Sequence, residues 1–332
     1  MTTISDIIKP EPLFLQSILE QSTELSRLFQ SGLVSREAVF DDFARGKGSV
    51  FDMPFWNDLS GASEGLSDSS SLTPQKLTQD KDRAVKHFRG AAWEVNDLAP
   101  IMVGDSAATR IRNRLSSFWN RDMQKTILIP SLTGIFDSAL ASTHVNDVAI
   151  EDGNNATDTE LIGSDQVIDT ANLLGDHWDR ITAMVMHSKP FARLQKLNLI
   201  SFEPLSEQGI EVPRFLGREI IVDDGVPVVD GGTNGKKYTT YLFGAGAVAM
   251  GDGTDAIVDV TETPAFEEER DGLAGNSYFI SRRQFIMHPR GVQFSGTPSG
   301  VTPTVSDLET GSNWTKAWSD KNIPIVSLVT NG

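Results

Sequence analysis

One long stretch of the sequence has helical spacing and restricts the possible folds more than any other segment. It opens near Asp105 and reaches Pro130. Asp105 is a suitable N-cap and proline stops most helices, so we expect about 24 helical residues spanning about 36 Å. One side of this helix is apolar, which predicts that it packs against a core. The residues of that side are Ala108, Ile111, Leu115, Trp119 and Met123.

A second side of the same helix is basic and carries Arg110, Arg114, Arg121 and Lys125, while Arg112 breaks the pattern. The chain as a whole has a formal net charge of -16, so acidic groups are in excess. We interpret this basic stripe as a solvated face or as the partner of acidic neighbours, and keep contact with DNA phosphates as the weaker alternative.

The segments before this helix carry apolar residues but little core of their own. Residues 11–30 place apolar side chains at roughly helical spacing, which predicts an amphipathic arm. Val50–Trp56 favours an edge strand stopped by Pro54, and residues 85–95 form a second extended segment that could return beside it. Such a hairpin is marginal in isolation, so another element must hold it.

After the long helix the pattern alternates between element types. Residues 166–174 and 190–197 have helical spacing on either side of a buried strand at 181–186, and strands dominate after Glu211. A segment at 146–165, rich in Asp, Asn, Gly and Thr, favours a surface loop or boundary. The chain therefore mixes helices with sheets.

Charge and composition exclude several classes of protein. The acidity argues against tight wrapping of nucleic acid, since phosphate affinity depends on Lys and Arg, so we expect DNA contact to be weak or local. The chain has no cysteine, which excludes disulfides and thiolate metal sites. Neither a secretion signal nor a stretch long enough to cross a bilayer is present, so we expect a cytoplasmic protein without a membrane partner.

Glycine-rich motifs for cofactors are incomplete. Gly244–Ala249 fits the G-x-G-x-x-A pattern of dinucleotide sites and follows a plausible strand. Gly251 and Gly253 interrupt the chain where the required helix should begin, so we favour small residues in a packed strand. The pair Asp223 and Asp224 precedes a Gly and is most simply an exposed turn.

Catalytic and metal-binding arrangements are also absent from the sequence. The histidines show no two at metal-ligand spacing on one element, and no glycine elbow surrounds His187 and Ser188. Residues 267–270 are most simply a charged turn, although Arg270 could pair across a subunit boundary. We therefore expect no catalytic, cofactor-binding or metal-binding residues, no cofactor, and no enzymatic activity.

Taken in order, a series of segments resembles the major capsid proteins of tailed bacteriophages, in particular a branch from phages of Gram-negative bacteria. The resemblance covers nearly the whole chain, although Ser106 stands where many relatives have proline. The segments are Ser31-Gly-Leu-Val, Met53-Pro-Phe-Trp-Asn-Asp-Leu, Leu174-Gly-Asp, Met186-His-Ser-Lys-Pro-Phe, Val222-Asp-Asp-Gly-Val-Pro, Tyr241-Leu-Phe-Gly-Ala-Gly-Ala, Arg283-Gln-Phe-Ile-Met-His-Pro-Arg-Gly-Val, Asn313-Trp-Thr-Lys and Lys321-Asn-Ile-Pro-Ile-Val.

This resemblance implies an α+β protein with the Hong-Kong-97-type phage capsid fold. The implied parts are an N-terminal arm (1–45), an extended loop (46–95), a peripheral domain with a spine helix (96–164), an axial domain (165–290), and a C-terminal segment that returns to the shell body (291–332). The arm and loop would bury Phe14, Phe55 and Trp56 on neighbouring copies. Burial in the chain's own core is an equally good interpretation for each residue alone.

The implied function is that of a structural subunit that self-assembles into the icosahedral head shell around double-stranded DNA. Its partners would be further copies of itself in hexamers and pentamers, with scaffolding, portal and cementing proteins, and weak non-specific contact with DNA. Assembly would occur in the host cytoplasm and the product would be the virion capsid. An encapsulin-like compartment is the alternative, and a dinucleotide-dependent oxidoreductase is a distant one.

Overall fold

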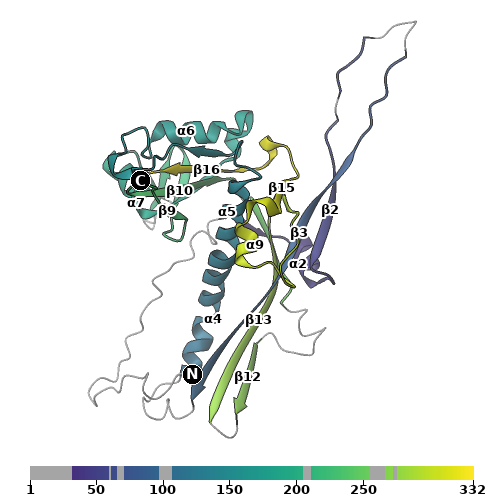
Figure 1. Ribbon diagram of the computed structural model, residues 1–332, viewed down its shortest axis with the longest axis vertical. Coiled ribbons are helices and arrows are strands. Elements are labelled where there is room, and N and C mark those ends of the chain that lie inside the picture. The colour runs from purple at the N-terminus through teal and green to yellow at the C-terminus, as the bar shows by residue number, and fades with distance from the viewer. Residues whose placement is uncertain are drawn as a thin grey trace.

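The computed structural model describes residues 32–59, 61–65, 71–96, 107–204, 211–254, 266–271 and 275–332. Figure 1 shows two bodies connected by a helical rod, and a hairpin that extends away from both. One body is built on a sheet with long strands, which we call the long sheet. The other is built on a sheet of shorter strands with helices on its surface, which we call the compact sheet.

The long sheet has the strand order β1-β11-β13-β3-β2, and β12 pairs with β13. Most neighbours are antiparallel, but β1 and β11 are parallel. The strands are β1 (Val34–Arg36), β2 (Val50–Trp56), β3 (Gln79–Asn96), β11 (Val248–Asp252), β12 (Phe266–Asp271) and β13 (Asn276–Pro289). A small third sheet pairs β14 (Val292–Phe294) with β15 (Trp314–Lys316).

The compact sheet has the order β4-β16-β10-β5-β8-β7-β6, and β9 pairs with β10. A core cluster that includes Val167, Leu194 and Leu242 lies between this sheet and its helices α6 (Ser164–Asn172) and α7 (Ser188–Lys196). The strands are β4 (Val145–Asp147), β5 (Ala183–Met186), β6 (Ser201–Pro204), β7 (Glu211–Phe215), β8 (Arg218–Val222), β9 (Val228–Asp230), β10 (Lys236–Phe243) and β16 (Ile325–Thr330).

The helical rod joins the two sheets and consists of α4 (Ala107–Met123), a π-helical turn (Gln124–Leu128) and α5 (Ile129–Asp137). Its predicted apolar side is confirmed, because Trp119 and Met123 are each 1% exposed in the main core cluster. The same cluster includes Leu132 of α5 and Tyr241 of the compact sheet. The rod therefore holds both sheets on one continuous core.

The prediction that Pro130 ends this helix is wrong. The backbone N–H of Ile129 donates to the carbonyl of Gln124, five residues earlier, so the chain uses a π turn there. In a regular α-helix a proline ring clashes with the carbonyl four residues earlier, and the wider turn relieves that clash. Pro130 then lies in the first turn of α5, where its missing N–H is least harmful.

The predicted hairpin is present, with two corrections. Strand β2 passes through Pro54 and continues to Trp56, since an edge strand can tolerate a residue without an N–H. Pairing of β2 with β3 covers Val50–Trp56 and ends at Val85. From Lys86 onward β3 pairs with β13 instead, so this part lies inside the long sheet.

Two predicted turns also need correction. Residues 267–270 lie in strand β12, because they pair along β13 as an edge of the long sheet. Asp223 and Asp224 do lie at a turn, but the side chain of Asp223 is not exposed as predicted. It is 4% exposed and accepts hydrogen bonds from the Gln124 side chain and Gly225 N–H. After Gly244–Gly246 the chain forms strand β11, and not the helix of a dinucleotide site.

The remaining elements are short. Helix α2 (Ala38–Arg45) packs on β11 and β13, and α9 (Val305–Glu309) packs on α5. The 3-10 turns are η3 (Gly153–Asn155), η4 (Gly175–Arg180), η5 (Gly311–Asn313) and η6 (Asp320–Asn322). None of the described helices is both long and apolar enough to cross a bilayer.

Candidate inter-subunit surfaces

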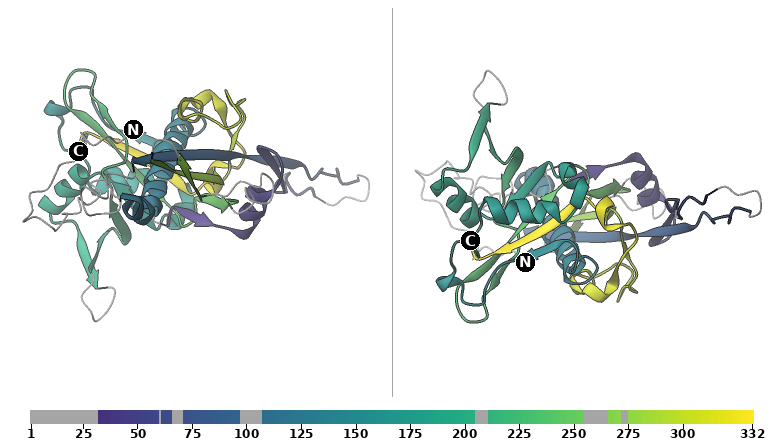
Figure 2. Two further views of the ribbon diagram at one scale, coloured as in Figure 1. Left: turned by 90° about the horizontal axis from the view of Figure 1, so that it is seen from below. Right: turned by 90° about the horizontal axis from the view of Figure 1, so that it is seen from above.

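The hairpin of β2 and β3 exposes large apolar side chains along its outer half. Trp56 is 64% exposed, and beyond the paired strands Leu59 is 82%, Leu72 57% and Leu77 49% exposed. Figure 2 shows that this limb stands clear of both bodies in two further views. No core is available to these side chains within the described part of the subunit, so they remain in water unless another molecule covers them.

The inner half of the hairpin is held by its own subunit. Phe51 and Met53 pack against a small apolar cluster that includes Ala44 of α2. The ring of Phe55 lies 6.4 Å from that of Trp318.

Ion pairs also hold the two strands of the hairpin together. Asp52 accepts hydrogen bonds from Lys81 Nζ at 2.9 Å and from Arg83 Nε at 2.7 Å. Hydrogen bonds from Arg83 and then Lys81 lower the pKa of Asp52 to about 2.

Buried polar groups fix the root of the hairpin to the long sheet. The side chains of Asp82 and His288, 4% and 2% exposed, interact at 2.9 Å, and Gly291 N–H donates to the same Asp82 oxygen. Lys86 Nζ donates to the Gly46 carbonyl after α2, and Gln284 Nε2 donates to the Ala44 carbonyl in α2. These contacts connect α2, β3 and β13 at one point.

Of the predicted contact residues, Trp56 lies exposed on the limb, and Phe55 has an aromatic neighbour within its own chain. Arg270 is exposed on the edge strand β12. Phe14 lies outside the described residues. Their roles between subunits stay predictions.

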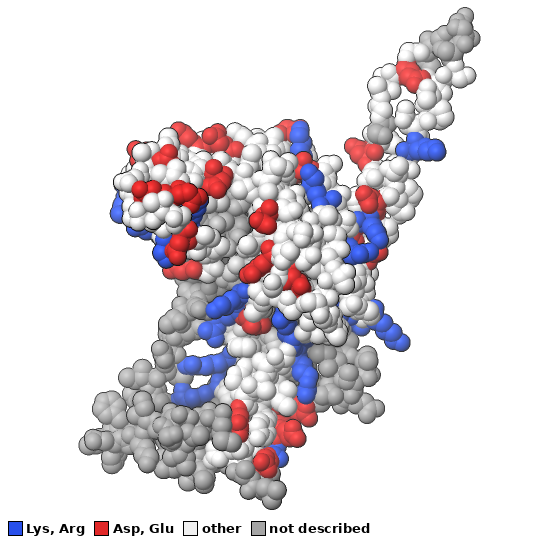
Figure 3. Space-filling model, viewed as in Figure 1, with Lys and Arg blue, Asp and Glu red and all other residues white. Residues whose placement is uncertain are grey.

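The predicted basic stripe follows α4 and the π turn after it, on the side opposite Trp119. Arg114 and Lys125 are exposed, while Arg110 and Arg121 are half-buried. Arg112 projects from the opposite side of the helix, where it forms an ion pair with Glu268 of β12. In Figure 3, Lys and Arg gather beside this rod, whereas Asp and Glu prevail over the compact sheet and its helices.

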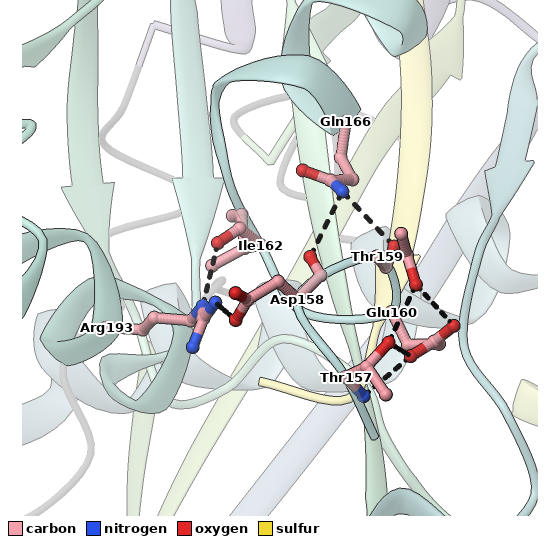
Figure 4. Close-up of polar contacts among 7 residues, drawn as sticks. All are labelled: Thr157, Asp158, Thr159, Glu160, Ile162, Gln166 and Arg193. Carbon is pink, nitrogen blue, oxygen red and sulfur yellow. Dashed lines mark hydrogen bonds and ion pairs between the residues drawn. The ribbon is translucent and has the colours of Figure 1, made fainter.

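A polar loop before α6 is held by its own side chains and by side chains of the two helices α6 and α7 (Figure 4). Arg193 of α7 donates to Asp158 at 2.8 Å and to the Ile162 carbonyl at 3.0 Å. Hydrogen bonds from Thr157 and Thr159 lower the pKa of Glu160 to about 2. The loop thus presents fixed carboxylates on the surface of the compact body.

The side chains of His187, Ser188 and Asp224 meet but do not form a catalytic triad. Ser188 Oγ at 3.3 Å, Asp224 Oδ1 at 3.5 Å and Lys189 N–H at 3.1 Å all approach the same nitrogen, Nδ1 of His187. A triad needs the two ring nitrogens to face different partners. His187 is instead the N-cap of α7. Within the described ranges, no cluster of three or more potential metal ligands occurs.

The sequence patterns did not indicate several residues that are candidates for contacts between subunits. Leu59, Leu72 and Leu77 lie in a segment whose sequence resembles an ordinary polar loop, and only the projection of the limb makes them conspicuous. Arg218, at the start of β8, is 6% exposed with its guanidinium carbon 5.8 Å from the centre of the Trp178 ring. No motif marks it, since its position against a ring 40 residues earlier is a tertiary property.

Comparison with known sequences finds a matching protein family and a related protein over nearly the whole chain. A family model described as Gp13-like, major capsid protein 13-like, matches residues 20–324. The major capsid protein of Bacillus phage SPP1 is 37% identical over 330 residues, which cover 98% of this chain and 97% of that protein. Restriction to phages of Gram-negative bacteria stays a prediction, because this relative comes from a Bacillus phage.

Solved structures share the fold at much lower identity. The capsid asymmetric unit of cyanophage Pam1 has a TM-score of 0.58 and 10% identity, covering 99% of this chain and 97% of that chain. The capsid of a native GTA particle, computed with C5 symmetry, has a TM-score of 0.53 and 12% identity, covering 98% and 96%. The expected α+β capsid fold is therefore confirmed.

Proposed function

Since the chain belongs to the Gp13-like family of major capsid proteins, we propose that its copies join as hexamers and pentamers through the β2–β3 limb. The chain is a major capsid protein of a tailed phage, and its place is the capsid of the virion. A fivefold ring is favoured by the C5 symmetry stated for the GTA capsid that shares this fold.

The observation that carries this proposal is the exposure of Trp56 and Leu59 on a limb without a core. Large apolar groups on a projecting element are characteristic of surfaces that another protein covers. Tryptophan is also among the residues most enriched at energetic hot spots of interfaces. In a shell of identical subunits, the body of the next copy is the nearest surface that can cover them.

The division of the chain follows the same proposal: arm 1–45, extended loop 46–95, peripheral domain 96–164, axial domain 165–290 and returning segment 291–332. Scaffolding, portal and cementing proteins would be the further partners, with assembly in the host cytoplasm. Packaged DNA would contact the shell weakly, and the exposed Arg114 and Lys125 are the groups best suited to phosphates.

The function proposed is structural and not enzymatic. The strand after Gly246 disfavours the dinucleotide-dependent oxidoreductase, because the phosphate-binding helix end is missing there. An encapsulin-like compartment is disfavoured because the family model and the SPP1 relative are both major capsid proteins.

Assembly of purified protein tests the proposal. In the double variant Trp56→Ser, Leu59→Ser, we expect the concentration needed for shell formation to rise by at least about tenfold, equivalent to 1.4 kcal/mol. Light scattering and electron microscopy measure this threshold. Because both side chains are exposed, the unassembled subunit should unfold at an unchanged denaturant concentration.

Lys76→Ser on the same limb is the matched control, because Lys76 is exposed but supplies no apolar anchor. It should assemble like the wild type. Shells formed by the double variant at the wild-type threshold would contradict the role of the limb, and a wild type that never forms shells would contradict the proposed function itself.

A further inference from the structure

Arg218 occupies an unusual place for a charged residue. It pairs with Phe215 across the β7–β8 turn, and strand alternation puts it on the same face of the compact sheet as Ile220. Both of those residues belong to the apolar cluster beneath α6 and α7. The Arg218 side chain therefore lies at the margin of a hydrophobic core.

Its guanidinium has no hydrogen bond or ion pair with any residue that the structure describes. The Nε atom is fully buried without an acceptor, and the guanidinium lies over the ring of Trp178 on η4. Burial lowers the pKa of Arg218, yet an arginine keeps its proton in proteins. The two terminal nitrogens are not fully buried, so another molecule can reach them. A largely buried guanidinium without a counter-ion is unfavourable, so this side chain needs an explanation.

Neither Glu219 nor Asp176 neutralises this guanidinium. Glu219, the next residue, is exposed on the opposite face of the strand. Asp176 of η4 is held by Lys321 Nζ at 2.6 Å. Among the described residues no carboxylate pairs with Arg218, so a carboxylate of another molecule is a fitting counter-ion.

The surroundings of Arg218 have the composition of an interface centre. Trp178 is 51% exposed, and Leu216 in the β7–β8 turn is 45% exposed. Leu216 has φ 50, a conformation that costs a side-chain-bearing residue about 1 kcal/mol or more and that is often retained at functional positions. Trp and Arg together are the residue types most enriched at hot spots, and apolar neighbours keep water away from them.

We propose that Arg218 and Trp178 form an anchor that receives a carboxylate side chain from a second copy of this chain in the shell. The inference rests on the proposed function and adds a specific contact to it. Charge complementarity identifies the partner: the chain has 45 Asp and Glu against 29 Lys and Arg, and carboxylates prevail on the visible face of the compact body (Figure 3). Each neighbouring copy therefore presents carboxylates, and docking one beside Arg218 neutralises its charge.

The substitution Arg218→Met separates this role from a purely structural one. Replacing an unpaired buried charge by an apolar side chain of similar size is neutral or stabilising in the free subunit. We therefore expect the unassembled variant to melt at the wild-type temperature or above it. Its assembly threshold should nevertheless rise by at least about tenfold, because the carboxylate of the neighbour loses its partner.

Two further variants complete the experiment. Arg180→Met removes an exposed arginine from the same turn, η4, and should change neither the melting temperature nor the threshold. Arg218→Lys keeps the charge without the planar fork, so it should recover part of the assembly.

An Arg218→Met subunit that melts well below the wild type, or that fails to fold, would overturn the proposal, because the guanidinium would then be satisfied within its own subunit. An unchanged assembly threshold would overturn it as well. In both cases wild-type shells would still form, so the proposed function would stand independently of this contact.

Discussion

The compact sheet and the β2–β3 limb are both built mainly from antiparallel strands, yet they use their apolar side chains in opposite ways. In the compact sheet Met184, Leu242 and Leu328 are each 0% exposed between the strands and helices of one subunit. On the limb Trp56 and Leu59 are mostly exposed. The first region buries its apolar side chains within one subunit, and the second carries apolar surface that the described part of one subunit leaves uncovered.

This difference shows how a subunit can be folded and still be incomplete. The polar root of the limb, with Asp82, Lys86 and His288, fixes the limb to the body without covering its outer half. Folding can thus be complete before assembly, and the free energy of burying Trp56 and Leu59 remains available for contacts between copies. Three predictions test this difference between the two regions.

The largest effect should come from the same substitution made in both regions. Leu242→Ala should lower the free energy of unfolding of the free subunit by about 2 to 5 kcal/mol, because it removes a fully buried side chain and leaves a cavity. Leu59→Ala should change it by less than about 0.5 kcal/mol. Denaturant unfolding of unassembled subunits measures both values. Similar losses for the two variants would remove the contrast.

An intermediate effect is expected at the root of the limb. Asp82→Ala leaves the ring of His288 and the N–H of Gly291 without their buried acceptor, which should destabilise the subunit by about 1 to 3 kcal/mol. Hydrogen exchange should accelerate at β3 and β13 more than in the compact sheet. Asp80→Ala, at an exposed position two residues earlier, is the control. Equal behaviour of the two variants would show that the limb is not fixed there.

The smallest effect concerns Asp52 on the limb. Its folded pKa of about 2 lies below the ordinary 3.8, so its contribution to stability is full above the ordinary value and is lost as pH falls towards 2. Because the side chain is 43% exposed, the contribution should be at most about 0.5 kcal/mol. The difference in unfolding free energy between the wild type and Asp52→Asn, followed from neutral to acid pH, measures it. A carboxyl titration midpoint near the ordinary value would contradict the bridging by Lys81 and Arg83.

Several elements could be predicted from local pattern because their causes are local. Helical spacing around Trp119 and Met123 indicates the rod, and the extended segment with Pro54 indicates an edge strand. The prediction that Pro130 ends the helix failed because a π turn accommodates the proline, and the spacing of apolar residues does not indicate such a turn. The exposure of Leu59, Leu72 and Leu77 was also missed, because a polar loop gives no indication of how far it projects.

Residue order and composition are sufficient to predict the mixture of helices and sheets, the absence of cysteine chemistry, the family resemblance and the hairpin with its apolar residues. These follow from residue order and composition, which every conformation of the chain shares. Three features became visible only in the folded chain: β3 divides its pairing between β2 and β13, Asp82 meets His288, and Arg218 lies against Trp178 without a counter-ion among the described residues. Such contacts join residues far apart in the chain, and their strength depends on burial, which no local pattern specifies.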